Sequence, residues 1–365
     1  MISSRPTRWG VIGLGVGNQH ALTLISDPTS QLVSVCDKDP QVLESVASLY
    51  GKVSMYTSSD EMLTSEDLDA IAVASYDWDH AAVIKLALDR HIHVFAEKPV
   101  GTSQEDFDLI LEALTRDQDV RLTTNTLLRY APRFAWLKHQ IDRGEFGDIV
   151  HVQADYLYGR LRKLTHGWRG TRSDYSVTLG GSIHMVDLLL WLVDKRPTSV
   201  VAIGSAKGSA GHRREDGSIF AGDSLRAGLL TFSDGTTASV SANFGSIGPH
   251  FHRLDVYGTE GTFMNLPTKP ATDQSSPGSV GLVLRGADPG TVEEERSGYP
   301  DVDKGAMLLD FNQCLLGVRE SPISEQEVMD TFAVCLALDQ AVNCSESVRI
   351  EYREVPRRQN VRESG

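Results

Sequence analysis

The spacing of hydrophobic and polar residues differs between the first and the second part of the chain. From Arg8 to about Thr124, short apolar runs alternate with longer stretches in which apolar residues recur at spacings of three and four. This pattern is typical of repeated βαβ units, so it predicts a parallel sheet with helices packed against it. The predicted strands are Trp9–Ile12, Leu32–Cys36, Ala70–Ala74, Ile92–Phe95 and Arg121–Thr124, and the predicted helices are Asn18–Ser26, Pro40–Tyr50, Trp78–Arg90 and Gln104–Thr115.

From Ile149 to about Val283 the rhythm changes to the shorter alternation that is typical of strands. Polar turns such as Ser233–Gly235 are expected to connect consecutive strands as hairpins. Helical spacing returns near the end of the chain. The predicted strands are Val150–Tyr158, Val200–Ser205, Ala227–Phe232, Thr237–Phe244, Arg253–Tyr257 and Thr262–Leu266, and the late helices are Lys304–Leu316 and Ser324–Asn343.

The change of rhythm predicts two domains, residues 1–128 and 129–350. A polar tail over residues 351–365 has few apolar anchors and is expected to be flexible. Two segments rich in Gly, Ser, Pro and charge, Lys207–Asp223 and Pro267–Ser279, are predicted to be mobile loops. Either loop could cover a bound substrate.

Composition narrows the class of partner. The chain has 365 residues, of which 41% are hydrophobic, so it is long enough to bury two cores. Its net charge of -14 disfavours nucleic acid and anionic membranes, which need a basic surface, and favours a small-molecule partner. Four cysteines without a CxxC pair fit reduced thiols, and no apolar run approaches the roughly 20 residues of a membrane span. A soluble, cytoplasmic protein is therefore expected.

A glycine-rich turn follows the first predicted strand and opens the first predicted helix. At Gly13, Gly15 and Gly17 the absence of a Cβ lets the backbone turn tightly and approach a phosphate, and the helix N-terminus can bind a pyrophosphate. In the usual fingerprint the third glycine lies three positions after the second, but here Asn18 occupies that position. The turn is therefore a variant of a dinucleotide-binding loop.

An acidic residue ends the second predicted strand. Asp37 lies 24 residues beyond Gly13, close to the separation at which a carboxylate accepts hydrogen bonds from the ribose hydroxyls of NAD. A carboxylate also repels the 2′-phosphate of NADP, although Lys38 next to it reduces that preference. The order of strand, glycine turn, helix, strand and Asp predicts a doubly wound Rossmann domain that binds NAD, with NADP possible.

The fourth of these strands leads directly into Glu97, Lys98 and Pro99. Because Pro99 has no backbone donor, it ends the strand, and it leaves Lys98 at the carboxyl edge of the sheet, where α/β proteins bind ligands. The polar turn Ser75–His80 precedes a helix at the same edge and is a candidate to line the nicotinamide half of the crevice. We predict no metal site, because His91 and His93 have no third ligand nearby.

Together these motifs resemble the glucose-fructose oxidoreductase, inositol dehydrogenase and rhizopine catabolism family, written Gfo/Idh/MocA. The resemblance covers nearly the whole chain, and Glu-Lys-Pro in this order of motifs is its most specific part. It is carried by the glycine turn followed by His20, and by Ser75–His80, Ala96–Pro99, Asn125–Phe134, Ile141–Ile149, Gly181–Asp187 and Tyr257–Thr262.

The resemblance implies a second domain of α+β class built on an open, mostly antiparallel sheet, with the late helix packed back on the first domain. It implies that Lys98 contacts the nicotinamide ribose and the substrate hydroxyl, that Glu97 belongs to the cofactor pocket, and that the chain forms a homodimer or homotetramer. The turn at Ser75–Asp77 departs from the more usual Thr-Pro-Asn. The complete predicted cofactor-binding set is Gly13, Gly15, Gly17, Asn18, Asp37, Lys38, Ser75, Tyr76, His80, Glu97, Lys98, Asn125 and Trp168.

A second candidate cluster lies in the later half of the chain. A double glycine, Gly180–Gly181, is expected to break the chain before an apolar helix that carries His184 and Asp187 three residues apart and thus on one face. The resemblance matches this pair to the His-x-x-Asp element that contacts substrate, and Gly180 stands where many relatives carry a further Asp. The predicted substrate-binding residues are Asp187, Tyr156, Arg129, Tyr175 and Arg169.

The leading hypothesis is an NAD(P)-dependent oxidoreductase that transfers a hydride between nicotinamide and a secondary alcohol or ketone of a sugar, cyclitol or sugar derivative. Lys98 and His184 are the predicted catalytic residues, and either could act as the base. Two alternatives stay open. The chain could use NAD without net redox change, for elimination or glycoside hydrolysis, as the missing carboxylate at Gly180 allows. It could also be a non-catalytic regulatory protein that binds a dinucleotide.

Overall fold

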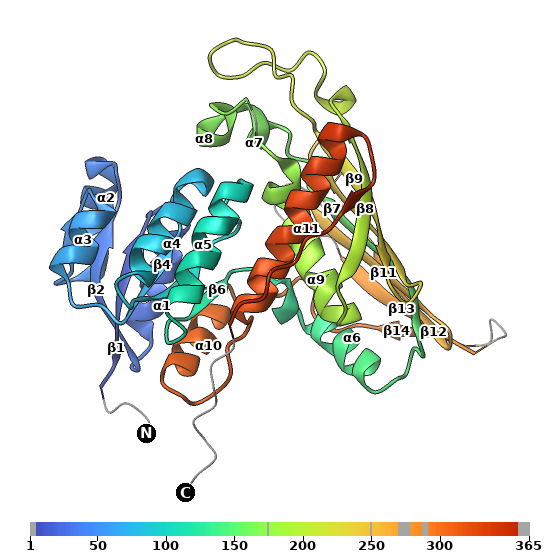
Figure 1. Ribbon diagram of the computed structural model, residues 1–365, viewed down its shortest axis with the longest axis horizontal. Coiled ribbons are helices and arrows are strands. Elements are labelled where there is room, and N and C mark those ends of the chain that lie inside the picture. The colour runs from blue at the N-terminus through green and yellow to red at the C-terminus, as the bar shows by residue number, and fades with distance from the viewer. Residues whose placement is uncertain (1–4, 174, 249, 269–277, 287–290, 357–365) are drawn as a thin grey trace, which may run out of the picture. The chain divides into compact units, whose positions relative to one another are not determined.

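The computed structural model describes residues 5–173, 175–248, 250–268, 278–286 and 291–356 (Figure 1). Its contacts divide the chain into two compact units. The first unit consists of Met1–Asn125, Asp303–Phe332 and Arg353–Gly365, and the second of Thr126–Val302 and Ala333–Tyr352.

The first unit is built on a six-stranded sheet in the order β3-β2-β1-β4-β5-β6. Every neighbouring pair in this sheet is parallel. This strand order confirms the predicted doubly wound Rossmann fold. The strands are β1 (Thr7–Ile12), β2 (Ser30–Cys36), β3 (Ser54–Tyr56), β4 (Ala70–Val73), β5 (His93–Ala96) and β6 (Leu122–Thr124).

Helices alternate with these strands, and side-chain caps fix several of their starts. Asp39 caps α2 by accepting a hydrogen bond from the backbone of Gln41, and Ser103 caps α5 in the same way. The sequence did not predict β3 and α3, because β3 is only three residues long and partly exposed. The helices are α1 (Gly17–Ser26), α2 (Pro40–Tyr50), α3 (Ser59–Ser65), α4 (His80–Leu88), α5 (Gln104–Arg116) and α10 (Ala306–Leu315), with a 3-10 turn, η1 (Asp77–Asp79), before α4.

Aromatic side chains join α10 to the sheet of the first unit. Phe311 lies 6.2 Å, between ring centroids, from both Trp9 of β1 and Phe95 of β5, and all three rings are fully buried. The indole Nε1 of Trp9 donates to Oδ1 of Asn312 at 3.1 Å, so the buried polar atom is satisfied. The core therefore fixes the strands whose carboxyl ends carry the glycine turn and Lys98.

The second unit is built on a nine-stranded sheet in the order β14-β13-β12-β11-β7-β10-β9-β8-β15. Among the described strands of this sheet, β7 and β10 form the single parallel pair, which confirms a mostly antiparallel sheet. The strands are β7 (Ile149–Leu157), β8 (Pro197–Ser205), β9 (Leu225–Phe232), β10 (Thr237–Asn243), β11 (Phe251–Gly258), β12 (Gly261–Pro267), β13 (Ser279–Arg285), β14 (Thr291–Glu295) and β15 (Val348–Arg349).

Several helical segments accompany this sheet, and the apolar helix α9 contacts β7 and β10. The expectation that Gly180–Gly181 breaks the chain was wrong, because a π-helical turn over Thr178–Ser182 continues directly into α9. The segments are η2 (Leu127–Tyr130), α6 (Pro132–Asp142), α7 (Arg162–Thr165), α8 (Gly167–Gly170), α9 (Ile183–Val193) and η4 (Lys207–Ser209).

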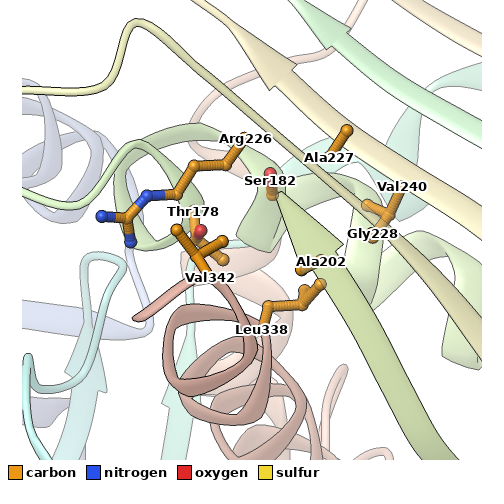
Figure 2. Close-up of a pocket in the computed structure, with 9 residues that line it drawn as sticks. All are labelled: Thr178, Ser182, Ala202, Arg226, Ala227, Gly228, Val240, Leu338 and Val342. Atoms are coloured by element: carbon orange, nitrogen blue, oxygen red, sulfur yellow. The ribbon is translucent and has the colours of Figure 1, made fainter. Parts of the chain in front are cut away.

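The π-helical turn is packed between the sheet and the last long helix, α11 (Glu325–Cys344). Figure 2 shows Thr178 and Ser182 close to Leu338 and Val342, with small residues of β8, β9 and β10 around them. One of these, Gly228, allows a close approach, since a Cβ there would lie 2.4 Å from a methyl group of Leu338. The π-helical turn that precedes α9 is therefore packed against α11 and the sheet.

The predicted loops and tail fall partly outside the described residues. In Lys207–Asp223, a β-bridge pairs Arg213 with Ile219, and most of Pro267–Ser279 is not described. In the predicted tail, the hydroxyl of Tyr352 donates to the backbone oxygen of Pro197 at 2.8 Å, while residues 357–365 lie outside the described part. Among the described helices, none is both long and apolar enough to cross a membrane.

Candidate active site

The glycine turn has the backbone geometry that a dinucleotide needs. Gly13 has φ of +86°, and a Cβ there would lie 2.5 Å from backbone atoms of Ala74. Among the residues that the structure describes, none apart from the two chain neighbours of Gly15 has an atom within 4 Å of its Cβ position, so a ligand can approach the backbone closely. Gly17 packs against Val11, where a Cβ would lie 3.0 Å away. The three glycines thus serve a turn, an approach to ligand and helix packing, respectively.

Helix α1 begins immediately after this turn, and its N-terminus carries no side-chain cap. The N-terminal end of a helix concentrates backbone N–H donors and partial positive charge, which favours a phosphate group. The open space at Gly15 lies next to these donors in sequence. The residues present therefore fit a pyrophosphate group.

Asp37 is anchored to the glycine turn. Its Oδ2 accepts a hydrogen bond from the backbone of Leu14 at 2.8 Å, and its Oδ1 accepts one from the backbone of Asp39 at 3.0 Å. The neighbouring Lys38 is exposed and donates to Asp79 at 2.8 Å. Asn18 accepts a hydrogen bond from Tyr50 at 2.6 Å, so its side-chain oxygen holds α1 to α2. Of Asp37, Lys38 and Asn18, Asp37 is therefore the residue that holds a carboxylate beside the glycine turn.

Glu97 is held by two side chains from other segments of the first unit. Nε2 of His20 lies 2.9 Å from Oε1 of Glu97, and Nδ2 of Asn125 donates to the same oxygen at 2.7 Å. Burial would raise the pKa of Glu97, but these hydrogen bonds and the positive charge of Lys98 outweigh it and leave the pKa below its ordinary value. His20 itself is buried, with its ring edge-on to Phe95. The carboxylate next to Lys98 therefore has a fixed position and charge.

His80 fixes the segment on the other side of Lys98. Its Nδ1 lies 2.7 Å from the backbone oxygen of Pro99, and its Nε2 lies 3.1 Å from that of Ser75. The ring is fully buried, so the geometry favours a positioning role for His80 over direct contact with a cofactor. Tyr76 next to Ser75 is partly exposed and packs on Trp78, with ring centroids 5.0 Å apart. His80 thus links the two loops that follow β4 and β5.

In the second unit, His184 lies in the first turn of α9 and belongs to an aromatic cluster. Its ring stacks on Tyr156 of β7, with centroids 5.8 Å apart and planes 18° apart. Tyr156 is almost completely buried, and burial raises the pKa of its hydroxyl far above the usual range. His184 keeps part of its surface exposed, as a residue that exchanges a proton with a ligand requires.

Asp187 and Arg129, both predicted to bind substrate, form a buried ion pair. Nε and Nη2 of Arg129 donate to the two carboxylate oxygens at 2.9 and 2.7 Å, and the two side chains are only 6% and 1% exposed. The guanidinium also lies over the ring of Trp191. A bidentate pair of this kind fixes both partners. It connects η2 to α9, so Asp187 and Arg129 are placed to orient the helix that carries His184.

The remaining predicted residues of the second unit gather around the short helix α8. The guanidinium of Arg169 lies 4.0 Å from the ring centroid of Trp168, and its Nε donates to the hydroxyl of Tyr175 at 2.9 Å. Trp168, Arg169 and Tyr175 are each partly exposed. The structure therefore brings these three together as one cluster.

The sequence missed residues that complete these clusters. In the second unit, β11 places His252 directly opposite Tyr156 of β7, and His250 lies 5.0 Å from the same tyrosine ring. Burial and the neighbouring His250 hold the pKa of His252 well below its ordinary value. The alternation of apolar residues indicated these strands, but it could not give their register. In the first unit, His20 stood in a quoted motif without a role.

Comparison with known proteins identifies the family. Residues 7–126 match a model described as an oxidoreductase family with an NAD-binding Rossmann fold, and residues 134–264 match the GFO/IDH/MocA C-terminal domain. The chain belongs to the Gfo/Idh/MocA oxidoreductase family. This confirms the predicted resemblance and the prediction of an NAD(P)-dependent dehydrogenase with NAD as cofactor.

Similar proteins include two curated members of known activity. The chain is 23% identical to an inositol 2-dehydrogenase/D-chiro-inositol 3-dehydrogenase of Shouchella clausii, over 96% of this chain and 95% of that protein. It is 25% identical to a 1,5-anhydro-D-fructose reductase of Ensifer adhaerens, over 94% and 98%, respectively. These relatives match the chain along nearly its full length.

Two solved structures share the fold. Levoglucosan dehydrogenase in complex with NADH has a TM-score of 0.80 at 17% identity, over 96% of this chain and 100% of that one. Scyllo-inositol dehydrogenase from Lactobacillus casei, with bound NAD(H) and scyllo-inositol, has a TM-score of 0.73 at 19% identity, over 95% and 99%. At these identities the likeness extends to the fold alone.

Proposed function

We propose that this protein oxidises a secondary alcohol of a cyclitol, sugar or sugar derivative with NAD, or reduces the corresponding ketone with NADH. The observation that carries this proposal is that Lys98 lies two residues after the end of β5, and that Glu97 between them is fixed by His20 and Asn125. Supporting it, similar proteins include dehydrogenases of inositol and a reductase of anhydrofructose. The bound nicotinamide would supply the hydride chemistry.

The first unit would hold the cofactor. The α1 N-terminus and Gly15 would receive the pyrophosphate, and Asp37 would accept hydrogen bonds from the ribose hydroxyls. Glu97 would serve the same pocket through its fixed carboxylate. Ser75, Tyr76 and Trp168 are further proposed cofactor contacts. Lys38, Asn18 and His80 bond to other protein groups, so we propose that they support the cofactor-binding segments rather than contact the cofactor.

The proton that leaves the alcohol oxygen needs an acceptor. His184, whose unperturbed pKa is about 6.5, suits this role near neutral pH, and Lys98 would stabilise the developing alkoxide with its positive charge. The alternative is that Lys98 acts as the base. The dependence of kcat/KM on pH would distinguish the two assignments. Asp187, which the sequence predicted to bind substrate, would act mainly by holding Arg129 and α9 in place.

The test is a spectrophotometric screen with NAD and with NADP against myo-inositol, scyllo-inositol, levoglucosan, 1,5-anhydro-D-fructose, glucose and glucose 6-phosphate. Lys98→Ala should lower kcat by roughly 100-fold or more, the usual effect of removing a group that stabilises developing negative charge, while the Kd for NAD changes less than about threefold. Lys52→Ala, an exposed lysine in the same unit, is the matched control and should leave both values unchanged.

The outcomes separate the competing functions. An unchanged rate in Lys98→Ala would contradict the proposed chemistry. Product formed in stoichiometric amounts without net NADH would instead favour a reaction with transient oxidation. Binding of NAD without turnover of any probe would favour a regulatory protein.

We also propose that the protein self-associates through the sheet of the second unit. Along β8 and β9, Val200 and Leu230 are buried, whereas Val201 and its cross-strand partner Leu229 are 45% and 55% exposed, and Ile203, two residues beyond Val201, is 70% exposed. Because successive residues of a strand face opposite sides, these exposed side chains form an apolar row on one face. A second copy of the chain is the proposed occupant, since a contiguous apolar patch is the usual mark of an interface.

A further inference from the structure

The segment from Arg160 to Arg172, which contains α7 and α8, concentrates positive charge in an acidic chain. We call it the basic segment. It has five Lys and Arg residues and no Asp or Glu, whereas the whole chain has 35 Lys and Arg against 49 Asp and Glu. A run of cations without acidic neighbours raises the local concentration of anions. The five residues are Arg160, Arg162, Lys163, Arg169 and Arg172.

Three of these cations form no ion pair with any residue that the structure describes. Arg160, Arg162 and Lys163 are all exposed, and no carboxylate is bonded to them within the described part of the chain. Other exposed cations of the second unit do have such a partner, as Lys195 has in Asp234. The positive charge of the three is therefore available to a ligand.

Arg160 lies at one end of a row of stacked rings that ends at His184. Its guanidinium carbon lies 5.1 Å from the ring centroid of Tyr158. Tyr158 stacks on Tyr156 with centroids 5.3 Å apart, and Tyr156 stacks on His184 with centroids 5.8 Å apart. Arg160 is exposed, and Tyr158 and His184 are each partly exposed. Both ends of the row are thus accessible from solvent.

Arg169 connects the other end of the basic segment to the turn that precedes His184. Its Nε donates to the hydroxyl oxygen of Tyr175 at 2.9 Å. A Cβ on Gly180 would lie 2.2 Å from the same oxygen, so this tyrosine packs directly on a residue four positions before His184. The basic segment therefore borders the neighbourhood of His184 at both of its ends.

Tyr156 gives independent evidence that the two ends meet near His184. A Cβ on Gly181 would lie 2.7 Å from Cδ1 of Tyr156, so this ring too packs on the turn before the histidine. Burial raises the pKa of Tyr156, while the positive charges of Arg169 and Arg160 act in the opposite direction. Because the effect of a charge weakens with distance, both guanidinium groups lie close to this tyrosine.

We propose that the substrate is a sugar or cyclitol derivative that carries an anionic group, a phosphate monoester or a carboxylate, and that Arg160 binds this group while the reacting carbon lies at His184. The inference rests on the proposed function and adds a substrate class to it. The planar guanidinium binds either oxyanion through two parallel hydrogen bonds. Arg162 and Lys163 would add to the positive potential that attracts the anion to this part of an acidic protein.

The primary test compares neutral sugars with their anionic counterparts. The pairs are glucose with glucose 6-phosphate, glucose with glucuronate, and myo-inositol with myo-inositol 1-phosphate, each with NAD. In at least one pair the anionic compound should have a kcat/KM roughly 10- to 100-fold above that of the neutral one, as expected for a charge-assisted contact. A preference for the phosphates would identify a phosphate site, and a preference for glucuronate a carboxylate site. Equal or lower kcat/KM for every anionic compound would overturn the inference.

Arg160→Gln tests the residue that we propose binds the anion. Arg160 is exposed, so the variant should fold as before, which thermal melting checks. KM for the preferred anionic substrate should rise roughly 10- to 100-fold, and the rise for its neutral parent should be at least about fivefold smaller. Arg143→Gln, which changes an exposed arginine that follows α6 in the same unit, is the matched control and should leave both KM values unchanged. Equal rises for the anionic and neutral compounds in Arg160→Gln would contradict the proposal, since a purely structural role predicts them.

Binding of inorganic phosphate separates this inference from the proposed function. Phosphate is titrated calorimetrically into protein saturated with NAD, which keeps the pyrophosphate site filled, and the Kd should be roughly tenfold weaker in Arg160→Gln than in the wild type. If the wild type oxidises neutral sugars and binds phosphate no better than Arg160→Gln, only the inference fails. If the wild type oxidises none of the compounds but the difference in phosphate binding is present, the proposed function fails and the anion site stands.

Discussion

Glu97 shows how individual side chains prepare the region around Lys98. Both His20 and Asn125 direct N–H groups to the same carboxylate oxygen, within 2.9 Å. A carboxylate that accepts such hydrogen bonds favours its charged form, and a mostly buried carboxylate without them would favour the neutral form. Backbone donors from Leu14 and Asp39 likewise fix the position of the Asp37 carboxylate. The positions of both carboxylates at this edge of the sheet are therefore set by specific donors.

Replacement of Glu97 should destabilise the protein in a pH-dependent way. The folded-state pKa lies below the unfolded value of about 4.3, so the stabilisation is present above that pH and is lost as the pH falls through the folded-state pKa. Glu97→Ala should lower the free energy of unfolding by roughly 1.5–3 kcal/mol at pH 7 and by less at pH 3. Urea denaturation at both pH values measures this, and Glu97→Gln, which keeps an acceptor oxygen, should lose less. A loss that is the same at both pH values would contradict the assignment.

Asp37 should control the choice between NAD and NADP. Asp37→Asn keeps an acceptor for the backbone of Leu14 but removes the negative charge that repels a 2′-phosphate. We expect the Kd for NADP to fall roughly tenfold and the Kd for NAD to rise roughly three- to tenfold, as measured by quenching of intrinsic fluorescence. Asp39→Asn, the cap of the following helix, serves as the control and should not alter the preference. If NADP binding is unchanged in Asp37→Asn, another group sets the specificity.

At the scale of elements, the carboxyl ends of β1 and β5 and the first turn of α9 carry the candidate chemistry. The sequence predicted these elements well, because the spacing of apolar residues along a short segment is enough to indicate a buried strand or an amphipathic helix. The sequence did not predict β3, which is only three residues long, and it wrongly predicted a break in the chain at Gly180 and Gly181, which lie in a π-helical turn. Glycine weakens a helix only when nothing compensates, and here the packing of two tyrosine rings does so.

The glycine turn offers a matched test of close packing against backbone conformation. Gly13 and Gly51 both have positive φ, of +86° and +70°, but only Gly13 has neighbouring backbone at its Cβ position. Gly51→Ala should therefore cost about 1 kcal/mol of stability and leave NAD binding intact. Gly13→Ala should cost several-fold more and weaken NAD binding at least tenfold, because the turn must move. Thermal melting and calorimetry measure both, and equal effects of the two substitutions would contradict this role for the turn.

At the scale of the whole molecule, the two units have different architectures and different tasks. The first has a parallel sheet whose strand ends suit a dinucleotide, and the second has a wide, mostly antiparallel sheet that carries His184 through α9. The net charge of -14 fits a small-molecule substrate. Lys98 provides a positive charge beside Glu97, and Arg169 provides one in the cluster around α8.

Self-association should depend on the exposed row along β8 and β9. Sedimentation velocity of the wild-type protein should show a dimer or tetramer. Ile203→Glu combined with Leu229→Glu should shift it towards a monomer, because two charges would then be buried at the interface. Lys52→Glu, on the first unit, is the control and should leave the assembly unchanged. A wild-type monomer would contradict the proposed interface.

The sequence by itself determined the doubly wound class of the first unit, the glycine turn, Asp37 and the strand that leads into Glu97 and Lys98, because each depends on residues that are near one another in the chain. It also indicated His184, Tyr156 and Tyr175, but not how they meet. Only the tertiary structure placed Tyr175 over Gly180 and Arg129 against Asp187. These contacts join distant segments, and they follow from strand register and side-chain packing, which no local pattern specifies.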